Sequence, residues 1–188
     1  MCETGGEAQV RAMAARLEEA GKEVVGWTVV DVACEILLTK KGLRDHREEV
    51  NRADAFLVLA CGGGTQAVRE CTDKPVYPGC NSLFLGDVRR MGQFEEMCSM
   101  CGECILAYTG GICPVTRCAK GLLNGPCGGT NNGKCEVDPE KDCAWTLIYN
   151  QLAKENRLDK MRRIFPPKDY SVQLKPAKRT IEVTRRKL

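Results

Sequence analysis

The chain has 188 residues, of which 43% are hydrophobic, 28% charged and 5% aromatic, and this composition excludes a wholly disordered, collagen-like or coiled-coil protein. The net charge is only +3, but residues 154–188 carry 12 Lys and Arg against 4 Asp and Glu, so the C-terminal end is basic. Thirteen cysteines against one histidine require a chemical reason beyond packing.

The first residues contain no pattern typical of a targeting segment. Residues 1–7 are acidic and glycine-bearing, without a basic start or an apolar stretch. The longest clean apolar run, residues 55–61, is far shorter than the roughly 20 residues that a membrane-spanning helix needs. We therefore expect a cytoplasmic protein with no membrane span. In a reducing compartment, clustered cysteines bind metal more often than they form disulfides.

The N-terminal half has the pattern of an α/β domain. Apolar residues at Val10, Met13, Ala14 and Leu17 predict a helix over residues 7–20. The β-branched run at 24–30 and the continuous apolar run at 53–60 predict two strands, with a charged helix over 43–51 between them.

A glycine-rich turn at 62–64 should then lead through a short helix to a third strand at 75–77. This alternation predicts a small doubly wound parallel-sheet domain over residues 1–97. The turn could also bind a dinucleotide, but no acidic residue ends the next strand, so we favour a tight turn that needs glycine.

Three dispersed cysteines are candidates for a metal site in this domain. Cys61 follows one predicted strand, and Cys34 follows an earlier one. Parallel sheets bind ligands at the carboxyl ends of their strands, so Cys2, Cys34 and Cys61 could converge on one edge. The alternative is that they are buried free thiols.

Eight further cysteines lie within residues 98–143, which is enough for two complete four-ligand sites. Cys98, Cys101 and Cys104 have the C-x2-C-x2-C spacing of iron-sulfur proteins, and Cys113 precedes a proline as in a 4Fe-4S motif. The spacing to Cys113 is longer than usual, which leaves the fourth ligand open.

The second set has the wider spacing of nine, eight and eight residues. Its members are Cys118, Cys127, Cys135 and Cys143. We expect a second 4Fe-4S cluster here, although zinc also binds four thiolates and is the alternative at this site. In either case the metal would replace the hydrophobic core that glycine-rich loops cannot form. We therefore predict a loop-rich, metal-stapled module over residues 98–165 that ends in C-terminal helices, followed by a basic extended tail over 166–188.

The chain is poor in groups for acid–base catalysis. The only imidazole, His46, lies in a charged segment, and no paired-carboxylate or catalytic-triad pattern is present. Two function classes follow: an electron-transfer subunit, or a zinc-stapled structural or nucleic-acid-binding module. We do not expect nucleic acid as the partner, since the basic tail lacks interleaved aromatic residues.

Several motifs together resemble the methylenetetrahydrofolate reductase C-terminal-domain family, which includes the MetV-type iron-sulfur subunits. The motifs are Cys98-Ser-Met-Cys101-Gly-Glu-Cys104, Thr109-Gly110-Gly111-Ile112-Cys113-Pro114, Arg117-Cys118-Ala119-Lys120, Leu123-Asn124-Gly125-Pro126-Cys127-Gly128-Gly129, Gly133-Lys134-Cys135-Glu136-Val137 and Cys143-Ala144-Trp145.

The resemblance implies that the chain is a subunit of an enzyme complex and does not catalyse the reaction by itself. It implies an iron-sulfur electron-transfer subunit that passes electrons to the flavin of a partner methylenetetrahydrofolate reductase, which makes methyltetrahydrofolate in one-carbon metabolism. On this interpretation FMN belongs to the partner subunit, and a ferredoxin or a larger redox complex supplies the electrons.

Overall fold

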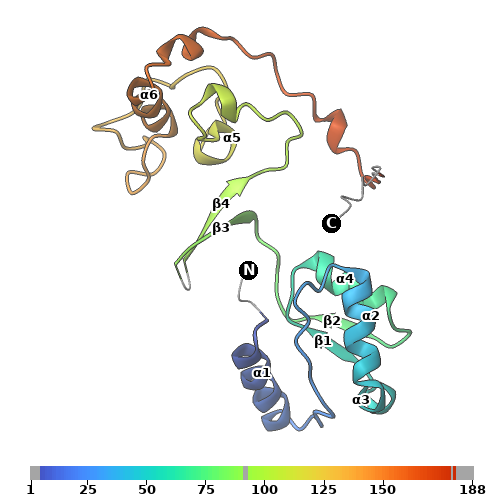
Figure 1. Cartoon of the computed structure of the whole chain (residues 1–188). Helices are drawn as coiled ribbons and strands as arrows, with labels where there is room; N and C mark the ends of the chain where they lie inside the picture. Colours follow the sequence, from blue (N-terminus) through green and yellow to red (C-terminus); the bar gives the residue numbers. More distant parts are fainter. Residues whose placement is uncertain (1–4, 91–92, 179, 181–188) are drawn as a thin grey trace. The chain divides into compact units, whose positions relative to one another are not determined.

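The structure is a computed structural model that describes residues 5–90, 93–178 and 180. The chain divides into two compact units, Met1–Leu83 and Phe84–Leu188, which are described separately (Figure 1). Across the described residues, none of the helices combines the length and apolarity needed to cross a bilayer. The fold has mixed helices and small sheets and is α/β in character, as expected.

The first unit opens with helix α1, Glu7–Glu19, where the apolar periodicity predicted it. The helix ends at Ala20, and Gly21 follows with a φ of +74°. This left-handed conformation suits glycine, which explains why the helix ends there. The charged stretch is also helical, as α2 (Ile36–Asp45) and α3 (Arg47–Arg52).

The sheet of this unit contains two short parallel strands. Strand β1, Phe56–Val58, pairs with β2, Val76–Pro78, and Phe56 lies opposite Val76. Helix α4, Gly62–Glu70, connects them as the crossover of a β-α-β unit. The glycine-rich turn is thus the first turn of α4.

The doubly wound sheet is not confirmed. Residues 24–30 were expected to form a strand, but no strand is assigned there, so the parallel sheet of the described residues has only two strands. Gly26 packs against the aliphatic part of Glu49, where a Cβ would be 2.7 Å from Cγ. Within this run Val30 lies against Gly42 of α2, where a Cβ would be 2.9 Å from its Cγ2, whereas Val29 is 46% exposed. β propensity reports side-chain packing as well as strand pairing.

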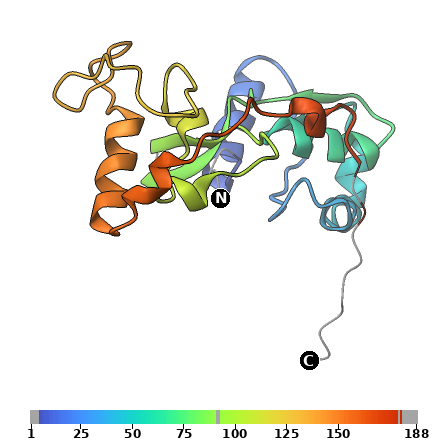
Figure 2. The same ribbon diagram turned by 90° about the horizontal axis from the view of Figure 1, so that it is seen from above.

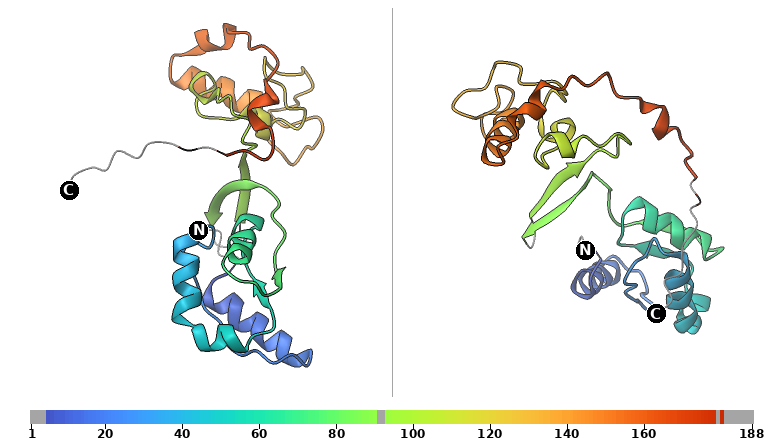
Figure 3. Two further views of the ribbon diagram at one scale, coloured as in Figure 1. Left: turned by 90° about the vertical axis from the view of Figure 1, so that its right-hand side faces the viewer. Right: turned by 45° about the horizontal axis from the view of Figure 1, so that its top comes forward.

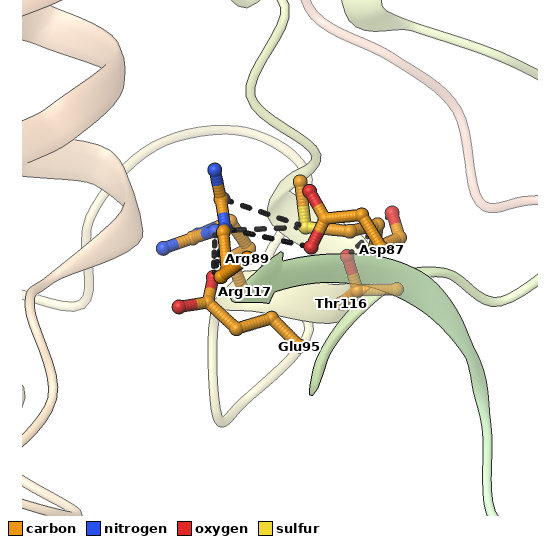
Figure 4. A network of polar contacts seen from close by, with 6 residues as sticks. Asp87, Arg89, Glu95, Thr116 and Arg117 are labelled. Carbon is orange, nitrogen blue, oxygen red and sulfur yellow. Dashed lines mark hydrogen bonds and ion pairs between the residues drawn. The ribbon is translucent and has the colours of Figure 1, made fainter. Parts of the chain in front are cut away.

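The second unit begins with a β-hairpin that the sequence analysis did not predict. Strand β3, Leu85–Arg90, runs antiparallel to β4, Gln93–Cys98. Its surface is charged, with Arg89 Nε 3.1 Å from the Glu95 carboxylate. Figure 4 shows this network, in which Arg117 also contacts Glu95 at 3.4 Å. The hairpin therefore ends at the first cysteine of the C-x2-C-x2-C motif and is tied to the segment around Arg117.

The core of the second unit lies around helix α6, Ala144–Lys154. Trp145, Ile148 and Leu152 are buried on one face, and Cys118 and Cys143 pack against them. The Trp145 indole N–H donates to the Leu122 carbonyl at 3.0 Å, which satisfies its only side-chain donor. Figure 2 shows α6 in orange with the long loops that precede it.

Three short helical turns complete the unit: η1 (Leu106–Tyr108), α5 (Pro114–Arg117) and η2 (Leu158–Arg162). After η2 the chain returns to the cysteine-bearing loop (Figure 3). There the short helix η3, Tyr170–Gln173, places Val172 against Gly102, and the Gln173 amide donates to the carbonyls of Ser99 and Met100. Part of the basic C-terminal region is thus packed against the loop.

Candidate metal centre

The twelve cysteines in the described part of the chain are all free thiols. Cys2, the remaining candidate ligand, lies outside the described residues. Free thiols are the chemical form that metal binding requires, because the thiolate is the ligand.

The second set is brought together. Cys118, Cys127, Cys135 and Cys143 all line one small cavity, although up to 25 residues of sequence separate them. The wall is completed by Pro126, Trp145 and charged side chains described below. Four thiols on one cavity are the donor set of a four-cysteine zinc site or a 4Fe-4S cluster.

Backbone hydrogen bonds hold the loops that carry these thiols. The Cys143 N–H donates to the Gly133 carbonyl at 2.7 Å, and the Cys135 N–H donates to the Lys141 carbonyl at 2.9 Å. Gly133 has a φ of +80°, a conformation in which glycine carries little strain. The tight turn at Gly133 therefore brings Cys135 back beside the start of α6.

Cys143 occupies the N-cap of α6, where backbone N–H groups are unpaired. Partial burial by itself would raise the thiol pKa. Hydrogen bonds from the Thr146 N–H and hydroxyl, the Thr130 hydroxyl and the Trp145 N–H outweigh burial, and the pKa of Cys143 is lowered. The position thus favours the thiolate, the form that binds metal.

In the first set, Cys98 is the last residue of β4, Cys101 and Cys104 lie on the loop that follows, and Cys113 precedes α5. Met100 has a φ of +54° and Gly102 a φ of +77°, so the loop curls tightly. The Met100 N–H donor lies 3.3 Å from Cys98 Sγ. Such N–H contacts to sulfur are typical of iron-sulfur loops and help to set the cluster potential.

Helix α5 connects the two cysteine sets. Cys113 of the first set is its N-cap and Cys118 of the second set its C-cap. Five residues at the usual helical rise correspond to about 8 Å along the axis. The Thr116 hydroxyl donates to the Met97 carbonyl at 3.3 Å, which holds α5 against the end of β4 beside Cys98. The two sets are therefore close neighbours.

In the first unit, the residues that precede two predicted ligands pack around one glycine, although no strand is assigned among the described residues before Cys34, so their convergence on a sheet edge stays a prediction. Gly64 lies against Ala60 and Ala33, where a Cβ would be 2.9 Å and 3.1 Å from their Cβ atoms. Cys61 and Cys34 directly follow these alanines in the sequence, and both are exposed.

Cys80 is a further candidate that the sequence analysis did not include. It follows β2, whose end is held beside β1 by the Gly79 N–H donating to the Val58 carbonyl at 2.8 Å. Cys80 and Cys61 therefore both follow the carboxyl ends of paired parallel strands. Its position shortly after the strand predicted at 75–77 was the available signal.

Within the described ranges, no three Cys, His, Asp or Glu side chains are placed closely enough to hold a metal ion. The fit of the residues to a metal group therefore rests on the donor chemistry. The second set fits, since four free thiols line one cavity and one of them is stabilised as a thiolate. The first set fits through its spacing and its N–H contact to sulfur.

The fold and the thiols define a cysteine-rich protein of mixed α/β character. A family model described as methylene-tetrahydrofolate reductase C terminal matches residues 77–171, which is just over half of the chain. The chain belongs to this family, which confirms the resemblance found in the sequence. Searches of curated proteins and of solved structures gave no match.

Proposed function

We propose that this chain is an iron-sulfur electron-transfer subunit of a methylenetetrahydrofolate reductase. The observation that carries the proposal is the cavity lined by four cysteines, within a chain whose family is that of the reductase C-terminal region. Iron-sulfur clusters supply one-electron steps, which the protein itself has no side chains to perform. Zinc at the second set is the alternative, because a cavity with four cysteines is also the usual structural zinc site.

The residues that would hold the clusters are the two sets already described. Cys98, Cys101, Cys104 and Cys113 would hold one 4Fe-4S cluster, and the cavity cysteines would hold the second. A third site at Cys2, Cys34 and Cys61 is part of the proposal. The protein supplies thiolates, N–H groups directed at sulfur, and the α5 turn that keeps the two main sets adjacent.

The partner in this proposal is the flavin-containing catalytic subunit. It would hold FMN and reduce methylenetetrahydrofolate to methyltetrahydrofolate, with a ferredoxin or a larger redox complex as the electron donor. Lys168 donates to the carbonyl of Glu103, the residue before Cys104, and the Arg163 guanidinium lies over the Tyr108 ring, so two cations lie near the first cysteine set. These cations would favour an acidic docking face on the partner.

Metal analysis of the full chain tests this proposal most directly. Anaerobically purified protein should contain iron and acid-labile sulfide in near-equal amounts, about four of each per cluster. Cys101→Ser should lose about one cluster. Cys71→Ser is the matched control, because Cys71 ends helix α4, outside all the proposed ligand sets. A colourless protein with zinc and no sulfide would refute electron transfer and leave the zinc-stapled module.

Reduction of the partner's flavin tests the second part of the proposal, which is electron transfer to the partner subunit. The reduced chain, mixed with the oxidised flavoprotein, should bleach the flavin absorbance, and the Cys101→Ser chain should do so at least tenfold more slowly. Equal rates for the two chains would show that this cluster does not carry the electrons.

A further inference from the structure

Two charged side chains on the four-cysteine cavity have no role in the proposed function so far. Lys120 follows Cys118 by two residues, and Glu136 directly follows Cys135. Both line the cavity, where the Lys120 ammonium donates a hydrogen bond to the Glu136 carboxylate. The same carboxylate lies 3.4 Å from Cys127 Sγ. A cation, an anion and a candidate metal ligand are therefore in mutual contact.

Gly129 creates the space for this arrangement. A Cβ at this position would overlap the Glu136 carboxylate, so only glycine lets the carboxylate lie on the loop of Cys127. The Gly129 backbone nitrogen is 3.5 Å from Cys127 Sγ. The Glu136 carboxylate therefore lies against the loop that carries the Cys127 thiol.

Charge balance distinguishes the roles of the two side chains. A divalent metal with four thiolates carries a net charge of about −2. A nearby ammonium stabilises this assembly, and a nearby carboxylate destabilises it. Lys120 lines the cavity together with the four cysteines, and its ammonium donates a hydrogen bond to the Glu136 carboxylate. Arg117 also lines the cavity, but its guanidinium is within 3.4 Å of the Glu95 carboxylate on the hairpin.

We propose that Lys120 balances the negative charge of the thiolates of Cys118, Cys127, Cys135 and Cys143, and that Glu136 limits this effect by pairing with Lys120. The inference rests on the proposed function only in requiring a metal or cluster at this set. It assigns opposite effects to two side chains that are in direct contact.

The alternative is that the ion pair is a structural clasp, which only holds two loops together. The direction in which each of two substitutions changes the rate of metal release separates the two possibilities. Charge balance predicts that Lys120→Met releases metal to a chelator about tenfold faster than wild type, the lower end of the usual effect of outer-shell changes. It also predicts that Glu136→Gln releases metal no faster than wild type. If both variants release metal faster, the pair is a clasp and the proposal is wrong. If neither changes the rate, the proposal is also wrong.

Lys134→Met is the matched control. Lys134 also forms an ion pair next to a cavity cysteine, 2.7 Å from Asp142, but it does not line the cavity. Lys134→Met should leave metal release unchanged, and Lys120→Arg should keep most of the wild-type retention. These variants show whether a general loss of folding explains the Lys120→Met result.

Two further measurements keep this inference distinct from the proposed function. If the set holds a cluster, a spectroscopic redox titration should give a lower midpoint potential for Lys120→Met and a higher one for Glu136→Gln. Cys127→Ser should remove the metal of this set. If the wild-type chain contains no metal that Cys127→Ser removes, this inference and the second site are both wrong. If metal is present but the two charge variants behave alike, only this inference is wrong.

Discussion

The two units of the chain support their cysteines in different ways. In the first unit, Cys61 and Cys80 follow paired strands of a β-α-β element whose backbone is already hydrogen-bonded. In the second unit, the cavity cysteines lie on glycine-bearing loops, and the buried core is limited to one face of α6. We therefore expect the first unit to keep its fold without a metal, and the loops of the second unit to depend on one.

Removal of metal should give the largest effect and is the most direct test of this difference between the two units. Stripping metal from the full chain should unfold the loops around α6, because structural metal sites supply folding free energy directly. Amide hydrogen exchange should show lost protection at residues 118–143 and retained protection in α4 and β1. Equal loss of protection in both units would contradict this difference between them. Cys71→Ser is the control variant and should change the protection of neither unit.

Truncation of the α6 core should give the next largest effect. Leu152 is fully buried, so Leu152→Ala should lower the free energy of unfolding of the second unit by about 2–5 kcal/mol. Denaturant unfolding of the metal-loaded chain, followed by Trp145 fluorescence with Trp27 replaced by Phe in all variants, measures it. Tyr149→Ala is the control on the same helix, since Tyr149 is 50% exposed, and it should change stability by less than about 0.5 kcal/mol. Similar losses for both would show that the core is not where the structure places it.

A pair of glycines sharpens the comparison within the second unit. Gly110 and Gly121 both have φ near +60°, but a Cβ at Gly110 would be 2.7 Å from Gln151 on α6, whereas Gly121 has open space. Gly121→Ala should cost about 1 kcal/mol for backbone strain. Gly110→Ala should cost about 1–3 kcal/mol more because of overpacking. Equal losses of stability in thermal unfolding would mean that Gln151 of α6 does not limit the space at Gly110.

The smallest effect concerns the C-terminal segment at low pH. Hydrogen bonds from Ser171 lower the pKa of Asp169 at the start of η3. A carboxylate with a lowered pKa stabilises the folded form above its unfolded pKa of about 3.9, and this contribution is lost as the pH falls through the folded value. Proteolysis near residues 168–174 should therefore increase below about pH 4. Asp169→Ala should show the faster cleavage already at neutral pH, and an unchanged rate would contradict this cap.

Sequence patterns predicted the elements whose signal is local. The apolar periodicity located α1, and the Gly21 end of that helix followed from its conformational freedom. The last four cysteines were grouped by their wider spacing, and all four line one cavity, but their assignment to one metal site stays a prediction. The charged hairpin was missed because its strands are rich in charged residues and carry little apolar pattern, and the contacts of Arg89 and Arg117 with Glu95 form only in the folded chain.

The other differences have the same cause. Residues 24–30 have high β propensity, but no neighbouring strand pairs with them in the described structure. The Lys120–Glu136 pair was not predictable, because it forms only where the Glu136 carboxylate lies against Gly129 on the loop of Cys127. Cys80 could have been included, since a residue after a predicted parallel strand lies at the same edge as Cys61.

The packing of η3 on the C-x2-C-x2-C loop has a consequence for how the protein is made. Gln173 contacts Ser99 and Met100, which are 74 and 73 residues earlier in the chain. At about 5–20 residues per second, the ribosome takes about 4–15 seconds to translate that interval. During this time the nascent loop lacks its contacts with Gln173. In the proposed iron-sulfur subunit, a donor of iron and sulfide would therefore reach the loop before η3 packs on it.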